Sequence, residues 1–339
     1  MPAVVGWDVG GANVKAARVE VGPGGPSVRV LSRPFEIWRE KDALPGLLRA
    51  MRAELGPAGA TAVTMTAELS DAFRTKREGV GFVLDAVAGA SSGVVSVFTT
   101  AAGFLDVVVA RAHPLEVAAS NWMATAALVA RHAADGLLVD VGSTTADLIP
   151  IRDGRVAARG RTDPERLLAG ELVYTGAVRT NVAAIVSRVP LWGGTCPVAA
   201  EYFAVSGDAH LLRGDLTPDE YTCPTPDGRP ATPEFAAERL ARVVCADAEM
   251  LTRAEIEAIA AAVAEAQVRE IAAALSRAAA DIAPSAPVIA TGQGAFLAHR
   301  AAAACGLPAR DLSALLGVDV GSAAPAVAVA WLLLDRGHA

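Results

Sequence analysis

The sequence predicts an α/β fold made of two halves that begin in the same way. Short apolar strand patterns alternate with helical segments along the 339 residues, as expected for sheets covered by helices. The segments VVGWDVGGANVKAARV (residues 4–19) and LLVDVGSTTADLIPI (residues 137–151) each place Asp-Val-Gly at the end of an apolar strand. Both then resume a strand pattern within about five residues. The repetition of this unit predicts a duplicated α/β domain.

Composition excludes several functional classes. Hydrophobic residues make up 53% of the chain and charged residues 20%, which excludes disorder for most of it. The net charge of −7 argues against a nucleic-acid partner. The longest uncharged apolar stretch, residues 323–334, is shorter than the roughly 20 residues of a membrane span, and no signal peptide is visible. Four cysteines without CxxC spacing fit reduced thiols, so we expect a cytoplasmic protein without a membrane partner.

The order of elements follows from apolar periodicity and turn residues. Strands are expected at residues 3–9, 14–21, 28–36, 61–66 and 94–98, and helices at residues 42–55, 74–90, 114–132 (as one long helix) and 252–282. Residues 190–250 are rich in Pro, Gly and Asp, which predicts an insertion of loops and short helices. We expect one domain over residues 1–134 and a second over residues 135–339.

Three glycine turns share one chemistry, because each follows an apolar strand at a point where backbone amides can converge on an anion. Asp8 and Asp140 stand at the ends of the first two strands, where each could hold hydrated Mg²⁺ beside phosphates. The alternative for both is a turn-stabilising Asx interaction. The candidate phosphate ligands, whose alternative is ordinary hairpin geometry, are Gly10, Gly11, Asn13, Gly142, Ser143, Thr144, Gly292 and Gly294.

Charged residues gather directly after the strand expected at residues 61–66. The cluster comprises Glu68, Asp71, Arg74, Lys76 and Arg77. Basic residues at the start of a helix oppose its dipole, which indicates an anionic ligand, although part of the cluster could be a solvated helix start. Lys76 and Lys15 are two of only three lysines in the chain. Lys15 follows the first turn and could approach phosphate, or could be an exposed strand residue.

Further candidates for substrate binding lie outside the turns. Asn121 stands in an otherwise apolar segment, where it could face ligand or make a packing hydrogen bond. Tyr174 and Arg179 occur in a glycine-punctuated stretch, and Arg179 could clamp a carboxylate. His210 beside Asp208 could act as an acid–base residue, but so polar a loop favours a surface position for it.

The order of the three turns resembles the superfamily of acetate and sugar kinases, actin and the large heat-shock ATPases. The matching segments are WDVGGANVKAA (7–17), LLVDVGSTTADL (137–148) and VIATGQGAF (288–296). The resemblance implies a two-lobed actin-like ATPase fold, a duplicated ribonuclease-H-like architecture in which the third turn touches adenosine. Kinases of this superfamily carry a hydroxyl residue where Ala12 stands here, and no sugar-hydroxyl base is evident.

Four other segments resemble a hydantoinase/oxoprolinase-related family linked to the methanofuran and tetrahydromethanopterin one-carbon pathway. They span residues 65–80, 101–130, 170–182 and 201–216. The resemblance implies a transferase that joins an aminomethylfuran-methyl diphosphate to the phenol of a tyramine-type acceptor such as glutamyltyramine. An aryl ether forms and diphosphate leaves, with Mg²⁺ as cofactor and ATP possible but not required.

In that reaction the phenol must lose a proton, and its ordinary pKa is about 10, so a base or cation beside it would help. Glu68 or Asp71 is the candidate base and Lys76 a catalytic cation. The expected partners are the diphosphate and phenolic amine substrates. A homodimer is a further possibility that the sequence allows. The alternatives are an ATP-dependent small-molecule kinase or hydantoinase/oxoprolinase-type enzyme of the same fold, and a non-catalytic nucleotide-binding scaffold.

Overall fold

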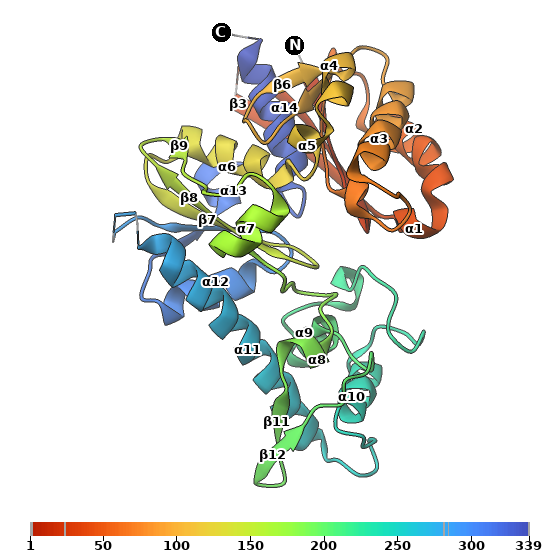
Figure 1. The fold of residues 1–339 in the computed structure, drawn as a ribbon, viewed down its shortest axis with the longest axis vertical. Coiled ribbons are helices and arrows are strands. Elements are labelled where there is room, and N and C mark those ends of the chain that lie inside the picture. The colour runs from red at the N-terminus through yellow and green to blue at the C-terminus, as the bar shows by residue number, and fades with distance from the viewer. Residues whose placement is uncertain (1–2, 24, 281, 284, 338–339) are drawn as a thin grey trace. The chain divides into compact units, whose positions relative to one another are not determined.

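A six-stranded mixed sheet organises the first part of the chain (Figure 1). The computed structural model describes residues 3–23, 25–280, 282–283 and 285–337. The strand order is β3-β2-β1-β4-β5-β6, in which β1 pairs antiparallel with β2 and parallel with β4. The strands are β1 (Ala3–Val9), β2 (Asn13–Gly22), β3 (Gly25–Pro34), β4 (Ala60–Met65), β5 (Val94–Phe98) and β6 (Phe104–Asp106). The strands predicted within residues 3–98 are therefore confirmed.

Helices cover both faces of this sheet. Val5, Trp7 and Val9 share a buried core with α2 (Leu44–Leu55) and α3 (Lys76–Ala90). The other face of β1 packs against α14 (Ala324–Arg336), which also contacts α6 (Asn121–His132). Gly6 permits this approach, because a Cβ at that position would lie 2.0 Å from the Ala326 carbonyl oxygen. The shorter helices of this part are α1 (Ile37–Glu40), η1 (Lys41–Ala43), η2 (Ala67–Leu69), α4 (Val107–Ala112) and α5 (Pro114–Val117).

The prediction of one long helix over residues 114–132 is wrong. The structure ends α5 at Val117 and begins α6 at Asn121, with Ala119 between them at a left-handed φ of 50°. The Ser120 hydroxyl donates to the Phe98 carbonyl oxygen at 3.1 Å and lies 2.8 Å from Thr64 Oγ1. These sheet contacts hold the chain away from helical geometry, and the apolar periodicity of the segment gives no sign of them.

A second sheet repeats the strand order of the first. It runs β10-β8-β7-β13-β14, with β9 paired to β8, so that the leading hairpin again supplies the central strand and its neighbour. The strands are β7 (Gly136–Val141), β8 (Ala146–Arg152), β9 (Arg155–Val156), β10 (Leu172–Val173), β13 (Val288–Thr291) and β14 (Ala309–Asp311). Helices α11 (Arg253–Ala279) and α12 (Ala295–Ala304) belong to the same compact unit as β13, whereas α7 (Asp163–Ala169) and α13 (Leu312–Leu316) belong to the unit of the first sheet. The common order confirms the predicted duplication.

The inserted region contains more regular structure than the sequence predicts. Short helices are confirmed, but a β-hairpin accompanies them, and the region shares a hydrophobic core with the first half of α11. The elements are α8 (Val182–Ile185), β11 (Arg188–Leu191), β12 (Gly194–Pro197), α9 (Ser206–Arg213), η3 (Pro218–Glu220) and α10 (Pro233–Arg242). A fully buried ion pair, Asp208 with Arg239 at 2.7 Å, joins α9 to α10. Tyr221 donates a further hydrogen bond to Asp208, which satisfies the buried carboxylate.

The chain forms two compact units. The first contains the residues up to Leu138, the segment Ile149–Ala169 and the residues from Asp311 onward. The second contains Val139–Leu148 and Gly170–Arg310. The chain therefore passes between the units within β7 and β8, and the closing helix α14 belongs with the first sheet. Among the described residues no helix is long and apolar enough to cross a membrane. The predicted domains, residues 1–134 and 135–339, stay a prediction.

Candidate functional site

The first glycine turn is a tight hairpin between β1 and β2. The Gly10 amide donates to the Asn13 carbonyl oxygen at 3.0 Å, and a Cβ on Gly10 would lie 2.7 Å from that oxygen. In the strand register Asp8 lies opposite Lys15 of β2 and opposite Thr64 of β4. Residues opposite each other share one face of a sheet, so the structure brings Asp8 and Lys15 together. Asp8 is buried, with 5% of its surface exposed.

The second glycine turn repeats this geometry between β7 and β8. The Gly142 amide donates to the Thr145 carbonyl oxygen at 2.8 Å, as Gly10 does to Asn13. The carbonyl oxygen of Ser143 accepts hydrogen bonds from the amides of Val178 and Arg179, at 3.1 and 2.8 Å. The backbone after residue 175 is therefore fixed against the second turn. These bonds place the half-buried Arg179 beside the predicted phosphate ligands Ser143 and Thr144.

Close packing of glycines joins the second and third turns. Gly292 has a left-handed φ of 86°, and a Cβ there would lie 2.3 Å from Asp140 Oδ1. The Gly294 amide donates to the Val141 carbonyl oxygen at 2.8 Å. Gly176, which the sequence analysis missed, leaves no room for a side chain, since its Cβ would lie 2.4 Å from the Thr144 amide nitrogen. Asp140 and the two turns thus form one cluster within the second unit.

A buried hydrogen-bond network links this cluster to α11. Gln267 of α11 donates to Thr175 Oγ1 and to the Gly176 carbonyl oxygen, both at 2.9 Å. Its own oxygen lies 2.9 Å from Nε2 of His210, whose Nδ1 lies 3.2 Å from the Asp215 carboxylate. Burial alone would raise the pKa of Asp215, but its hydrogen bonds from His210 and Arg300 outweigh burial and lower it. The expectation that His210 is a surface residue is wrong, because its side chain is fully buried.

Glu68 is a buried carboxyl group of the first unit whose pKa is strongly raised. It is 1% exposed, and neither carboxylate oxygen has a hydrogen-bond partner of normal geometry. Burial raises its pKa from 4.5 to about 7, although backbone amides and the nearby Lys76 ammonium act in the opposite direction. A carboxyl group with a pKa near neutrality can hold or release a proton at working pH, as a general base requires.

An ion pair lies beside Glu68, and the helix that carries Asp163 also carries an arginine stacked on Trp122. Lys76, the first residue of α3, forms an ion pair with Asp163, the first residue of α7, with its Nζ 2.9 Å from Oδ2. Arg166, one turn further along α7, places its guanidinium 4.1 Å from the ring centre of the buried Trp122. Asp163 is 87 residues from Lys76 in the chain, and the sequence analysis missed it. The structure thus adds Asp163 to the charged cluster predicted from residues 68–77, and Arg166 lies on the same helix as Asp163.

Residues 59–336 match the sequence model of the hydantoinase/oxoprolinase family. The chain belongs to the hydantoinase/oxoprolinase family. Of the curated proteins it resembles, the (4-{4-[2-(gamma-L-glutamylamino)ethyl]phenoxymethyl}furan-2-yl)methanamine synthase of Methanocaldococcus jannaschii is 39% identical over 254 residues, which are 75% of this chain and 74% of the relative. The protein of the same name from Methanococcus vannielii is 40% identical over 119 residues, 35% of this chain and 53% of the relative.

The fold of this hydantoinase/oxoprolinase family member is the predicted α/β fold, with two sheets of the same strand order. It is similar to a nucleotide-free structure of acetone carboxylase, with a TM-score of 0.58 and 11% sequence identity. The match covers 96% of this chain and 70% of the carboxylase chain. That carboxylase is described as ATP-dependent, and identity at this level shows the fold alone.

Most of the remaining predicted residues of this family member lie at the surface. Helix α3 begins at Lys76 and is capped by the Thr75 side chain, so Arg74 precedes the helix and only Arg77 stands in its first turn beside Lys76. The residues Asp71, Arg74 and Arg77 are exposed, Tyr174 is 61% exposed, and Asn121 is half-buried at the first position of α6. The exposed members of the charged cluster therefore differ from Glu68, which the fold buries.

The residues present fit a magnesium–phosphate complex better than a metal bound by protein alone. Within the described part of the chain, no group of three or more His, Cys, Asp or Glu side chains could hold a metal ion. Mg²⁺ at phosphate sites usually needs one or two carboxylates, with waters and phosphate oxygens as its other ligands. Asp140, which lies against the Gly292 backbone beside the Gly142–Thr144 turn, suits that arrangement.

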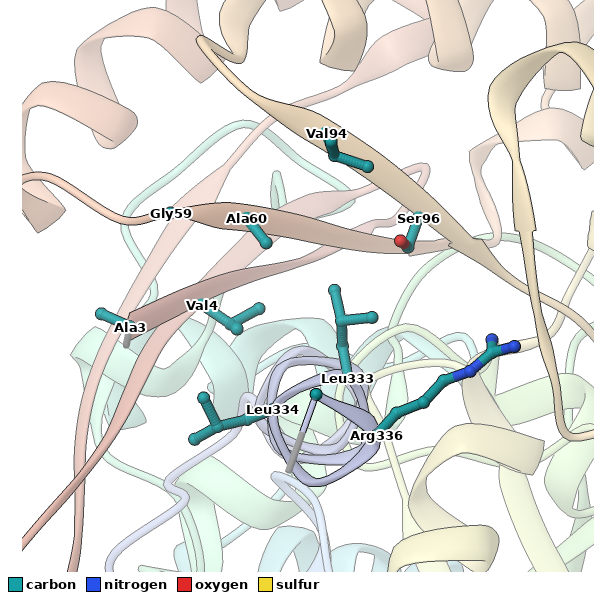
Figure 2. Close-up of a pocket in the computed structure, with 10 residues that line it drawn as sticks. Ala3, Val4, Gly59, Ala60, Val94, Ser96, Leu333, Leu334 and Arg336 are labelled. Atoms are coloured by element: carbon teal, nitrogen blue, oxygen red, sulfur yellow. The ribbon is translucent and has the colours of Figure 1, made fainter. Parts of the chain in front are cut away.

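One apolar cavity lies away from all the predicted site residues. It has a volume of about 400 Å³ and is lined by Ala3, Val4, Ala60 and Leu333, among others (Figure 2). Ala3 begins β1, whereas Asp8 stands near the end of that strand. The cavity is therefore at the end of the first sheet opposite to the first glycine turn.

Proposed function

We propose that this protein is a transferase that condenses an aminomethylfuran-methyl diphosphate with the phenol of a tyramine-type acceptor such as glutamyltyramine. The relatives' name describes a phenoxymethyl-furan, an ether between a phenol oxygen and a furfuryl carbon. The observation that carries the proposal is Glu68, a buried carboxyl group whose raised pKa suits removal of a phenol proton. It stands in the first unit beside the ion pair of Lys76 and Asp163.

The proposed reaction is a displacement at the furfuryl carbon. The phenol oxygen forms the new C–O bond, the bond from that carbon to the diphosphate oxygen breaks, and the diphosphate leaves with the electron pair. The phenol proton passes to the ionised Glu68 carboxylate. A phenol has a pKa of about 10, so a base with a pKa near 7 is most effective when proton removal accompanies C–O bond formation. Atoms and charges balance without ATP.

Charges around Glu68 set how readily it takes the proton. The Lys76 ammonium lowers the pKa of Glu68 and Asp163 raises it. Because Asp163 pairs with Lys76 at 2.9 Å, the ammonium is fixed in place and its charge is partly neutralised. Burial is the main cause of the raised pKa of Glu68, and Asp163 is proposed as a positioning residue that fixes Lys76 and adds to that rise.

The second unit offers the groups that a diphosphate needs. The backbone and hydroxyl groups of Gly142, Ser143 and Thr144 are proposed to bind its oxygens, with Asp140 holding Mg²⁺. When bound, Mg²⁺ would neutralise the negative charge that develops on the leaving diphosphate. In the first unit, Lys15 is proposed to attract phosphate from beside Asp8. Gly292 and Gly294 support the second turn, whether or not a nucleotide binds there.

The test supplies the furfuryl diphosphate and glutamyltyramine with Mg²⁺ and without ATP. We expect stoichiometric release of diphosphate and an aryl ether detectable by mass spectrometry. The matched control acceptor lacks only the phenol hydroxyl, and should release diphosphate no faster than water alone. Release that does not depend on the hydroxyl, or ATP turnover that the substrates stimulate, would contradict the proposal and favour an ATP-dependent enzyme of the same fold.

A further inference from the structure

A second hollow of the first unit is large, has an apolar floor and lies apart from the predicted site. Its volume is about 740 Å³, within the range of about 300–1,000 Å³ found for small-molecule sites. It is bounded by β9, by the turn between β5 and β6, by residues of α6 and by the end of α14. The side chains of Phe98, Met123 and Leu332, each less than 10% exposed, form its floor. Phe98 makes an edge-to-face contact with Phe104, which also lines the hollow.

The lining of this hollow is strongly positive in a protein whose net charge is −7. Its charged residues are four arginines and one aspartate, namely Arg131, Arg155, Arg161, Arg336 and Asp335. Asp335 neutralises Arg131 at 2.6 Å, and Arg161 donates to the Thr100 carbonyl oxygen at 3.3 Å. Among the described residues, Arg155 and Arg336 have no ion pair, and both are exposed at the rim. The rim therefore offers two guanidinium groups whose charge is not balanced by a carboxylate of the described residues.

We propose that this hollow is a binding site for a small anion that carries one flat apolar ring, such as an aryl or furanyl phosphate or carboxylate. Guanidinium groups match the paired oxygens of these anions, and repulsion between the arginines is relieved when an anion binds between them. The ring would pack on the floor formed by Phe98, Met123 and Leu332. No residue predicted for catalysis or phosphate binding lines the hollow, so the proposal does not rest on the transferase activity.

Calorimetric titration with phenyl phosphate tests the site, in the presence of saturating magnesium diphosphate to occupy the glycine turns. Two double variants reverse the same amount of charge. Arg155→Glu with Arg336→Glu removes the rim, and Arg29→Glu with Arg310→Glu changes two exposed arginines that do not line the hollow. We expect the dissociation constant to rise at least tenfold in the rim variant and to change less than twofold in the control. Equal effects in both variants, or no binding to the wild-type protein, would overturn the proposal.

Two further arms test the apolar floor and the class of anion. Ala127 lines the hollow and is half-buried, so Ala127→Phe should fill it and abolish binding while every arginine is retained. Inorganic phosphate should bind at least tenfold more weakly than phenyl phosphate. Equal binding of the two would refute the proposed packing of the ring on the apolar floor. Benzoate in place of phenyl phosphate separates carboxylate from phosphate ligands, and binding of either supports the site. Equal binding of the cationic benzylamine would refute the role of the rim arginines.

Discussion

Replacement of Glu68 by Gln should remove the transfer activity and make the protein more stable at alkaline pH. Folding raises the pKa of Glu68 from 4.5 to about 7. Between these two values the native state binds more protons than the unfolded state, so the contribution of Glu68 to stability falls as the pH rises. A shift of about 2.5 units at about 1.4 kcal/mol per unit gives a total loss of about 3 kcal/mol, complete above pH 7. Glutamine resembles the neutral acid and does not have this loss.

The assay is urea unfolding at pH 5 and pH 8 without ligands. Trp7 and Trp122 are buried in the first unit, so tryptophan fluorescence reports its unfolding. Part of the loss has already occurred at pH 5, so we expect the stability difference between Glu68→Gln and the wild type to increase by about 2.5 kcal/mol from pH 5 to pH 8. Glu201→Gln, at an exposed position, is the matched control and should show no such increase. The reasoning is refuted if the difference for Glu68→Gln does not change with pH, or if this variant keeps the activity.

The other predictions concern the neighbours of the two clusters. Lys76→Ala should move the acid limb of the pH–rate profile to higher pH, because the ammonium lowers the pKa of the buried carboxyl beside it; an unchanged profile would contradict this role. Gly176→Ala should weaken diphosphate binding at least tenfold in calorimetry, because its methyl group would lie 2.4 Å from the Thr144 nitrogen, whereas Gly46→Ala, with nothing within 4 Å, should bind normally. Gln267→Leu leaves three buried partners unsatisfied, so chemical denaturation should show a loss of at least about 2 kcal/mol, and a smaller loss would argue against the network.

The duplicated architecture could be predicted because its evidence is local in the sequence. An apolar strand, an Asp-Val-Gly ending and a second strand follow one another within about twenty residues, and each half contains the full unit. The amide of Gly10 and the amide of Gly142 make equivalent hairpin hydrogen bonds, as the repeat indicates. Turn chemistry and strand periodicity were sufficient here, because neither depends on distant residues.

The failures occur where tertiary contacts override local preference. Ser120 interrupts an alanine-rich segment because its hydroxyl bonds to Phe98 and Thr64 of the sheet. These partners precede it in the chain by 22 and 56 positions. His210 stands in a polar segment, yet Gln267 and Asp215 bind both of its ring nitrogens inside the second unit. In both cases the partners come from other elements, so no window of sequence contains the whole interaction. Periodicity alone assigns such residues to the wrong environment.

Burial distinguishes Glu68 from the other charges of its cluster, and a glycine is the local cause. The sequence around the five charged residues within positions 68–77 does not indicate which of them is buried. Only the fold separates the buried Glu68 from the exposed Asp71. A Cβ on Gly79 would lie 2.6 Å from the Glu68 Cα, so α3 can approach the carboxyl-bearing turn only because position 79 has no side chain. That approach excludes water and raises the pKa of Glu68. The sequence therefore contains the determinant of burial, but Asp163, which pairs with Lys76 from 87 residues away, could be found only from the folded chain.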